Sequence, residues 1–386
     1  MCRAREIVPG TSIAATALSP TPIRVYFQDS SNGVREFSHS WAGWTGGTSH
    51  DIRFQAKPRS PLAVMEWVEG DKTRHIRIYA LDKQNIIHEQ CWDRSKGWHQ
   101  GSLTSKAIVP ASFSKLATTL WLGRSDLRVY YQRDDQRIQE HRYSSGTGWT
   151  LGATMGALLD TKPYKGTNIA SIGWGTPGRS FIRNYVQDED NAIWEHSSES
   201  SWSSLRLVGA VGKPYTPLAA VTWSDGKHGR RHIHLYSLDM DNQIQEYCYE
   251  GHDWHGGSLT SKKIQTAPYS NLSAIYWDSK IRVYFQSVDN GTIAEYCTDY
   301  GSEWFPGDVL SATPAGFKAI DTNGATYPVG WLPWIEDLKS WQTYDPSTID
   351  AVGVLVGFID GKLIGEDLKN QNAMILKPNT IGNSYA

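Results

Sequence analysis

Three residue types that can bind a polar ligand recur together along this chain of 386 residues. They lie in a phrase of the form I-R-V-Y-F-Q, a turn, x-E and then G-W, which occurs six times. The basic positions are Arg24, Arg77, Arg128, Arg183, His234 and Arg282; the glutamates are Glu36, Glu89, Glu140, Glu195, Glu246 and Glu295; the tryptophans are Trp44, Trp98, Trp149, Trp202, Trp254 and Trp304. The repetition predicts one small site built six times.

These side chains together suit a small polyhydroxylated ligand. Hydroxyl groups are well solvated, so a binding site must replace the hydrogen bonds they make to water. Arginine offers a fixed fork of donors, and a carboxylate accepts from two hydroxyls. An indole ring covers an apolar C–H face and can donate at its edge. The set therefore indicates a monosaccharide or another small polyol as the ligand.

A purely structural role for the charged pair is the first alternative. The glutamate follows the basic residue by 12 positions in five repeats and by 13 in the last. In a hairpin that turns midway, this spacing would place the two side chains across from each other. Such a cross-strand pair contributes roughly 0.2–1 kcal/mol to stability.

Catalysis is disfavoured by the repetition itself. A glycoside hydrolase needs two carboxyl groups with separate roles, about 5–9.5 Å apart. Six similar glutamates that each face a cation would all be held ionised. The chain contains no S-x-D-x-G-x-x-W, G-x-S-x-G, H-E-x-x-H or P-loop motif, and its aspartate-rich turns lack calcium-loop spacing. We therefore expect no catalytic residue, no metal and no cofactor.

The elements that must position these side chains are short strands. The basic position recurs after 53, 51, 55, 51 and 48 residues, the size of one four-stranded propeller blade. A small apolar strand precedes the I-R-V-Y-F-Q strand, and the glutamate lies on a third. We expect the fourth strands at DIRFQA (51–56), KAIVPA (106–111), LRLVGA (205–210) and KKIQTA (262–267). The pattern predicts an all-β fold, a six-bladed β-propeller of four-stranded antiparallel blades.

Two further expectations concern the packing of this ring. REIVPG (5–10) and DVLSATPAG (308–316) both resemble a fourth strand, and we expect the first to close blade six. Tryptophans also recur at the end of the first strand, and we expect them to pack between blades. They are Trp67, Trp121, Trp174, Trp223 and Trp277.

The repeat ends near residue 315, which predicts a propeller domain over 1–315 and a C-terminal extension over 316–386. In the extension, VGVLVGFIDGKLIGED predicts a hairpin that turns at Asp360-Gly361. The sequence does not define the rest of its structure or its function. At about 70 residues the extension is marginal as an independent domain, so we expect it to pack on the propeller or to mediate self-association into a homodimer.

Composition limits the partners and the location. The net charge of −2 does not favour nucleic acid as a partner, and no apolar run approaches the ~18–20 residues needed for membrane insertion. No signal-peptide core is present near the N-terminus, so we expect a cytoplasmic protein or one exported non-classically to the cell surface.

The cysteines follow the repeat. Cys91, Cys248 and Cys297 each lie two residues after a repeat glutamate, whereas Cys2 lies outside the repeat. Equivalent places in different blades are too far apart for a disulfide. These three are expected to be buried free thiols.

The motif, its order, its spacing and its copy number resemble those of the fungal fucose-specific lectins of the Aleuria type. The resemblance covers about residues 5–315 and leaves the extension without a counterpart. It implies a multivalent lectin that binds L-fucose on fucosylated oligosaccharides and glycoproteins. In that family the sugar lies between adjacent blades, with Arg and Glu from one blade and the aromatic residue from the G-W segment of the next.

Carried over residue by residue, the resemblance implies six sites. Site 1 is Arg24, Glu36 and Trp98; site 2 is Arg77, Glu89 and Trp149; site 3 is Arg128, Glu140 and Trp202; site 4 is Arg183, Glu195 and Trp254; site 5 is His234, Glu246 and Trp304; site 6 is Arg282, Glu295 and Trp44.

Site 5 departs from the pattern. Histidine has a shorter reach than arginine, fewer donors and only partial charge at pH 7, so we expect this site to be degenerate. Site 3 is weakened by SSW in place of G-x-G-W around Trp202, and site 6 by the extra residue before Glu295.

Two other functions stay open at this point. One is a propeller glycosidase or lyase acting on fucosylated glycans, and the other is a protein-interaction scaffold in which the Arg–Glu pairs are structural.

Overall fold

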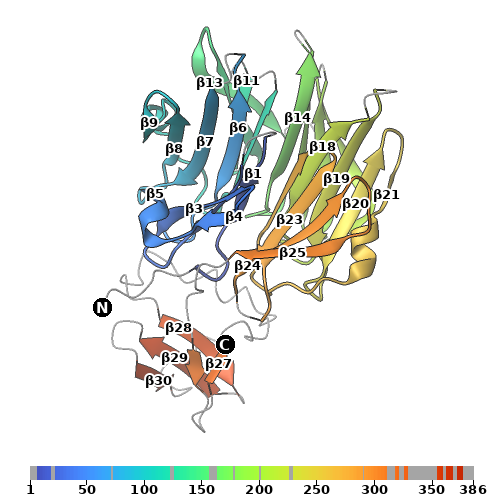
Figure 1. The fold of residues 1–386 in the computed structure, drawn as a ribbon. Helices are drawn as coiled ribbons and strands as arrows, with labels where there is room; N and C mark the ends of the chain where they lie inside the picture. The colour runs from blue at the N-terminus through green and yellow to red at the C-terminus, as the bar shows by residue number, and fades with distance from the viewer. Residues whose placement is uncertain are drawn as a thin grey trace. The chain divides into compact units, whose positions relative to one another are not determined.

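The computed structural model describes residues 7–18, 22–70, 73–121, 126–155, 163–176, 179–199, 201–225, 229–289 and 291–310, together with five strands beyond residue 317. The chain divides into two compact units, Met1–Ala315 and Gly316–Ala386. The first unit contains six antiparallel sheets in which successive strands pair with one another. Figure 1 shows these sheets in chain order from blue to orange.

The first three blades cover the N-terminal half of the ring. Blade 1 is β1 (Ala14–Thr16), β2 (Ile23–Gln28), β3 (Gly33–Ser40) and β4 (Gly43–Gly46), with β5 (Ile52–Gln55) also paired to β3; blade 2 is β6 (Ala63–Val68), β7 (Arg74–Leu81), β8 (Ile87–Asp93) and β9 (Gly97–Gln100); blade 3 is β10 (Leu116–Trp121), β11 (Asp126–Gln132), β12 (Ile138–Ser144) and β13 (Gly148–Met155).

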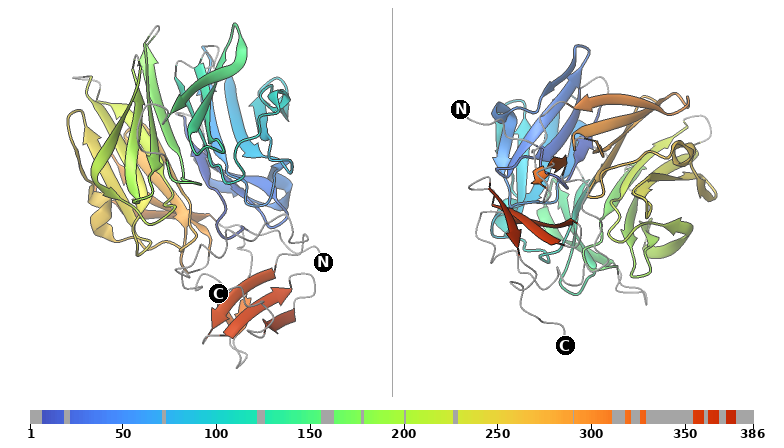
Figure 2. Two further views of the ribbon diagram at one scale, coloured as in Figure 1. Left: turned by 180° about the vertical axis from the view of Figure 1, so that it is seen from behind. Right: turned by 90° about the horizontal axis from the view of Figure 1, so that it is seen from below.

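Blades 4 to 6 form the C-terminal half of the ring. Blade 4 is β14 (Ala170–Thr176), β15 (Arg179–Gln187), β16 (Ala192–Ser198) and β17 (Trp202–Val211); blade 5 is β18 (Ala219–Ser224), β19 (Arg231–Leu238), β20 (Ile244–Glu250) and β21 (Trp254–Gly256); blade 6 is β22 (Leu272–Trp277), β23 (Lys280–Gln286), β24 (Ile293–Asp299) and β25 (Phe305–Leu310). The first strands of neighbouring blades lie against each other, and β1 contacts both β6 and β22, so the ring is closed. Figure 2 shows the sheets arranged around a common axis. The predicted six-bladed propeller is confirmed.

Blade 6 is completed by its own last strand, so the expectation for REIVPG is wrong. Strand β25 pairs with β24, with Leu310 opposite Ile293. The described part of the N-terminal segment instead forms a bridge to blade 1, from Ile7 to Asp29, and hydrogen-bonds blade 6 through the side chain of Gln286, which contacts the backbone of Val8 and Gly10. Pairing two strands joined by a short turn closes a much smaller loop than pairing the two ends of the ring.

The fourth strand of most blades begins at the G-W segment itself. In blades 2 and 5 the segments KAIVPA and KKIQTA are not the fourth strand; single-turn 3₁₀ helices, η2 (Thr104–Lys106) and η4 (Ser258–Lys262), follow β9 and β21. DIRFQA is present as β5, and LRLVGA lies within β17. The G-W tryptophan is therefore carried by the outermost strand in blades 1 to 5, and in blade 6 Trp304 directly precedes that strand.

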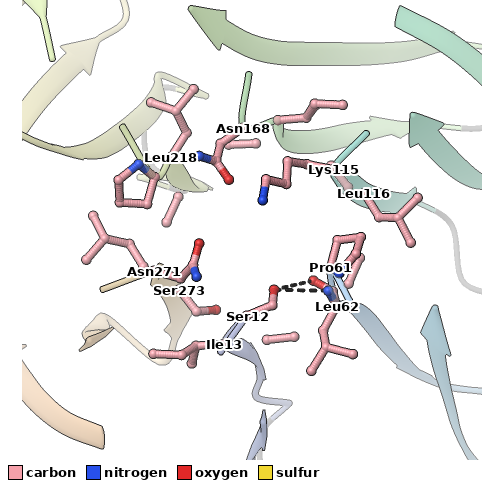
Figure 3. Close-up of a pocket in the computed structure, with 18 of the residues that line it drawn as sticks. Ser12, Ile13, Pro61, Leu62, Lys115, Leu116, Asn168, Leu218, Asn271 and Ser273 are labelled. Carbon is pink, nitrogen blue, oxygen red and sulfur yellow. Dashed lines mark hydrogen bonds between the residues drawn. The ribbon is translucent and has the colours of Figure 1, made fainter. Parts of the chain in front are cut away.

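A cavity of about 140 Å³ lies where the first strands meet. Each blade contributes the residue just before or near the start of its first strand, namely Ser12, Pro61, Lys115, Asn168, Pro217 and Asn271. Figure 3 shows Lys115 and Asn168 at this cavity, and Ser12 joined to Leu62 of the next blade. The Ser12 Oγ accepts from the Leu62 N–H at 2.9 Å. None of the repeated Arg, Glu and G-W Trp residues lines this cavity.

Apolar cores lie between blades, and the first-strand tryptophans belong to them. Trp67 packs with Leu127 and Val129 of blade 3, and Trp174 packs with Leu235 of blade 5. Trp121, Trp223 and Trp277 lie in the equivalent clusters. Their predicted packing between blades is confirmed. Cys91, Cys248 and Cys297 are free and buried, as predicted, and Cys2 lies outside the described residues.

The second unit contains β26 (Lys318–Ile320) paired with β27 (Thr326–Pro328), and a sheet of β28 (Val354–Ile359), β29 (Lys362–Asp367) and β30 (Asn372–Leu376). Strands β28 and β29 are antiparallel, with Ile359 opposite Lys362, which confirms the pairing of the two predicted strands; the predicted turn residues Asp360 and Gly361 lie outside the described residues. Across the described residues, no helix has the length and apolar character needed to cross a membrane.

Candidate functional site

The centre of each repeat is a hydrogen-bonded tyrosine and glutamate on the middle hairpin of a blade. The hairpin pairs Tyr26 with Glu36, Tyr79 with Glu89, Tyr130 with Glu140, Tyr185 with Glu195, Tyr236 with Glu246 and Tyr284 with Glu295. The tyrosine hydroxyl donates to the carboxylate over 2.8, 2.9, 3.2, 2.9, 3.1 and 2.7 Å, in the same order. The tyrosines are 0% exposed and the glutamates 1–8% exposed.

Sequence reasoning missed these tyrosines, although the letter Y follows the basic residue by two positions in all six phrases. Burial, and next the adjacent carboxylate, raise the pKa of every one of them well above its usual value. The hydroxyl therefore stays protonated and acts as a donor. It holds one carboxylate oxygen in place for the rest of the site.

The arginine does not lie directly across from the glutamate, as the spacing suggested. Arg24 pairs in register with Ser38, while Glu36 lies two residues further along the same face. The hairpin is centred on Ser31, one residue later than midway, and the neighbouring Asn32 has a φ of 66°. Arginine and glutamate are thus diagonal neighbours, which long side chains can still bridge.

Most of the predicted cation–carboxylate pairs are formed. The Nε of Arg24, Arg128, Arg183 and Arg282 lies 3.3, 2.8, 3.1 and 3.7 Å from its glutamate, and the Nδ1 of His234 lies 2.9 Å from Glu246. In blade 2, Arg77 bonds Asp93 at 2.9 Å and acts on Glu89 electrostatically.

Two of the glutamates differ from the expectation that all six would be held firmly ionised. Burial raises the pKa of Glu89, opposed by the Leu103 N–H and the Tyr79 hydroxyl. Burial likewise raises the pKa of Glu195, opposed by Arg183 and Tyr185. Loss of water around the carboxylate outweighs the nearby cation at these two positions.

The first-strand tryptophans hold the cations in place as well as packing between blades. The guanidinium carbon lies over the ring of a tryptophan in the same blade at 4.9 Å for Arg77, 4.7 Å for Arg128, 5.1 Å for Arg183 and 5.1 Å for Arg282. Trp223 packs on the His234 ring at 4.7 Å. Leu18 stands at this position in blade 1, so Arg24 lacks the indole support.

The tryptophan of each site comes from the following blade, as the resemblance implied. Ring contacts of 6.2, 5.9, 6.3 and 6.2 Å join Tyr79 to Trp149, Tyr185 to Trp254, Tyr236 to Trp304 and Tyr284 to Trp44, all near perpendicular. Trp98 packs in the cluster of Tyr26, and Trp202 in that of Tyr130. All six predicted sets are therefore brought together across blade boundaries.

A glycine of the outer strand makes room for the carboxylate. A Cβ added at Gly101, Gly152, Gly257 or Gly307 would overlap Glu89, Glu140, Glu246 or Glu295. Next to these glycines, the backbone N–H groups of Leu103, Ala153 and Leu259 donate to the carboxylate at 2.8, 3.1 and 2.9 Å. The second glycine of G-W-x-x-G therefore lets the backbone approach and satisfy a buried charge.

Site 1 has an additional cation. Arg53 on β5 bonds Glu36 at 3.1 Å, and its guanidinium carbon lies 5.5 Å from the ring centre of Trp98. It thus joins the carboxylate of blade 1 to the indole of blade 2. One face of the Trp98 ring is thus already in contact with a protein side chain.

Comparisons with known proteins agree with this geometry. The family model for fungal fucose-specific lectins matches residues 7–180 and 164–322. A fucose-specific lectin of Aleuria aurantia is 31% identical over 305 residues, covering 76% of this chain and 92% of that protein. One from Aspergillus oryzae is 29% identical over 308 residues, covering 78% and 93%. A solved structure of the Aleuria aurantia lectin in complex with Fucα1-6GlcNAc superposes with a TM-score of 0.69 at 29% identity, covering 81% of this chain and 100% of that one.

Replacing Gly257 by alanine should destabilise the protein, because the new methyl group overlaps the Glu246 carboxylate. We expect the free energy of unfolding to fall by about 1–3 kcal/mol, as for other overpacked interiors. The measurement is urea unfolding followed by tryptophan fluorescence. Gly256→Ala is the matched control, since nothing lies within 4 Å of a Cβ added at that neighbouring position. Equal stability of the two variants would contradict the role given to the glycine.

Proposed function

The chain belongs to the family of fungal fucose-specific lectins, and we propose that it binds L-fucose on fucosylated oligosaccharides and glycoproteins. Its sites lie at the blade boundaries. Each combines the tyrosine-held glutamate and the basic residue of one blade with the G-W tryptophan of the next. The convergence of these groups supports the proposal, because it repeats at all six boundaries.

The chemistry of one site follows from its parts. The glutamate accepts hydrogen bonds from sugar hydroxyls, and the arginine donates to hydroxyl and ring oxygens. The indole covers the C–H face of the ring. Apolar contact with the C5 methyl would favour a 6-deoxy sugar over galactose by roughly 1–3 kcal/mol.

A single site should bind weakly. A ligand of this size in a small rigid site gains roughly −4 to −7 kcal/mol, which corresponds to millimolar to about 10 μM. Several sites on one ring can raise the avidity for a glycosylated surface by ~10²–10⁴. Self-association into a homodimer through the C-terminal unit would double the number of sites and is part of this proposal.

Binding without catalysis is also part of the proposal. The same Tyr–Glu pair recurs in every blade, whereas a hydrolase needs an acid and a base with separate roles. The relatives with assigned names are lectins.

The sites should be unequal. Sites 2, 3, 4 and 6 carry an arginine supported by an indole. In site 1 the sugar must displace Arg53 from Trp98, and in site 5 His234 replaces the arginine.

A glycan array probed in the presence of EDTA tests the function. We expect binding to fucosylated glycans that free L-fucose competes away, and no release of free fucose.

Calorimetry with methyl α-L-fucoside should show fewer than six equal sites. The Glu140→Gln variant should lose one strong site, because the amide lacks the charge that pairs with Arg128. If the protein bound no fucosylated glycan on the array, the proposed lectin function would be refuted. Release of free fucose would favour a glycosidase instead.

Replacing Arg53 by alanine should strengthen site 1, since it frees Glu36 and the face of Trp98. A desolvated cation–π contact contributes roughly 1–2 kcal/mol. We therefore expect about tenfold tighter binding at this site, seen by calorimetry as one additional strong site. Arg133→Ala is the control, because this arginine is 47% exposed in a surface turn. If Arg53→Ala binds no more fucose than Arg133→Ala, Arg53 does not block the site.

As the pH falls, sites 2 and 4 should lose fucose binding at a higher pH than the other sites. Glu89 and Glu195 have raised pKa values, so they become protonated at a higher pH than an ordinary glutamate and lose an acceptor for the sugar. We expect part of the fucose capacity to disappear as the pH falls towards the range just above the usual glutamate pKa of about 4.3. Calorimetry between pH 7 and pH 4 measures it. The Glu89→Gln/Glu195→Gln double variant should lack this early phase; an unchanged profile would contradict the assignment.

A further inference from the structure

Blade 5 differs from the other blades at one position of the site, and the change alters its chemistry. His234 lies directly opposite Cys248 in the β19–β20 hairpin, and Glu246 lies two residues before that cysteine. The three side chains therefore share one face. Their ligand atoms, an imidazole nitrogen, a carboxylate oxygen and Sγ, all lie within 4.8 Å of one another.

Imidazole, carboxylate and thiolate are the three ligand types that zinc accepts. Blades 2 and 6 have the same glutamate and cysteine, Glu89 with Cys91 and Glu295 with Cys297, but arginine stands opposite the cysteine. A guanidinium has no lone pair to offer a metal. Blades 1, 3 and 4 lack the thiol, because Ser38, Arg142 and Ser197 occupy its place. Within the described part of the chain, the full set of ligands occurs in blade 5 alone.

We propose that His234, Glu246 and Cys248 bind one divalent transition-metal ion of the zinc class, with a fourth position open to water. Zinc–nitrogen and zinc–sulfur bonds of ~2.0–2.3 Å place tetrahedral ligand atoms ~3.5 Å apart. The observed separations of up to 4.8 Å thus require the ligand atoms to approach one another by at most about 1.3 Å.

The surroundings hold these ligands in position. The Leu259 N–H donates to one oxygen of Glu246 at 2.9 Å, which leaves the other oxygen 2.9 Å from the His234 Nδ1. Trp223 packs on the imidazole ring at 4.7 Å and restrains its rotation. The Tyr236 hydroxyl donates to the same oxygen of Glu246 at 3.1 Å, so it is an outer neighbour that positions the carboxylate.

Metal binding would also neutralise the buried negative charge of Glu246. Glu246 is 1% exposed, and arginine is the cation beside the equivalent glutamate in every other blade. On binding, the thiol of Cys248 releases its proton to solvent. The metal takes the place of the hydrogen between His234 Nδ1 and Glu246, and the imidazole keeps its proton on Nε2 by exchange with solvent. No change of oxidation state is involved. The ion would then supply the positive charge that arginine supplies elsewhere.

The test uses the full chain without a polyhistidine tag, freed of metal by EDTA and then dialysed. Zn²⁺ titration by calorimetry should give one site per chain. Co²⁺ titration should give a thiolate-to-cobalt charge-transfer band, which reports the cysteine directly. His234→Arg recreates the residue set of blades 2 and 6, and Cys248→Ser recreates the serine of blades 1 and 4. Each should lose the band and weaken Zn²⁺ binding by more than the ~100-fold that changes beside a metal site reach.

Cys91→Ser and Cys297→Ser are the matched controls and should keep both the site and the band. His234→Gln provides a second variant if His234→Arg does not fold, because an amide can still hydrogen-bond Glu246. Absence of the band in the unaltered protein, or its retention in Cys248→Ser or His234→Gln, would overturn the proposal. The readout involves metal alone, so its failure leaves the proposed fucose sites unaffected.

Discussion

The buried carboxylate of each blade sets the requirements for the rest of the site. A nearly inaccessible glutamate is costly unless its oxygens are satisfied. The tyrosine two residues after the basic position meets part of that need, and in blades 2, 3 and 5 a backbone N–H beside a glycine meets another. The arginine, held on an indole in four blades, supplies the opposite charge.

Closure of the ring gives the six blades six boundaries. Because the indole comes from the next blade, no isolated repeat contains all the groups of a proposed site, and the last set is brought together only where blade 6 meets blade 1 through Tyr284 and Trp44. The apolar clusters that join neighbouring blades carry the same tryptophans that support the arginines. Stability of the ring and geometry of the sites therefore depend on the same interfaces.

Single substitutions on this common backbone change what a site can do. Arg53 places a second guanidinium against both Glu36 and Trp98, the groups proposed to bind the sugar in site 1. His234 replaces a permanent cation by a group with a lone pair, next to a carboxylate and a thiol. Repetition frees one copy to diverge, since the remaining sites preserve multivalent binding.

The sequence alone determined the six-bladed fold, because a phrase repeated six times at blade-sized intervals marks the equivalent residues of each blade. Together with the family resemblance, the same phrase predicted the residues of the proposed sites and their assignment to neighbouring blades. It did not reveal the buried Tyr–Glu pair, the diagonal placement of Arg24, or the strand that completes blade 6. Those depend on where each hairpin turns and on which strand is nearest in space. The arrival of Arg53 at Trp98 and the raised pKa of Glu89 were decided only by the tertiary structure, because burial and contacts between separate blades leave no local signal in the chain.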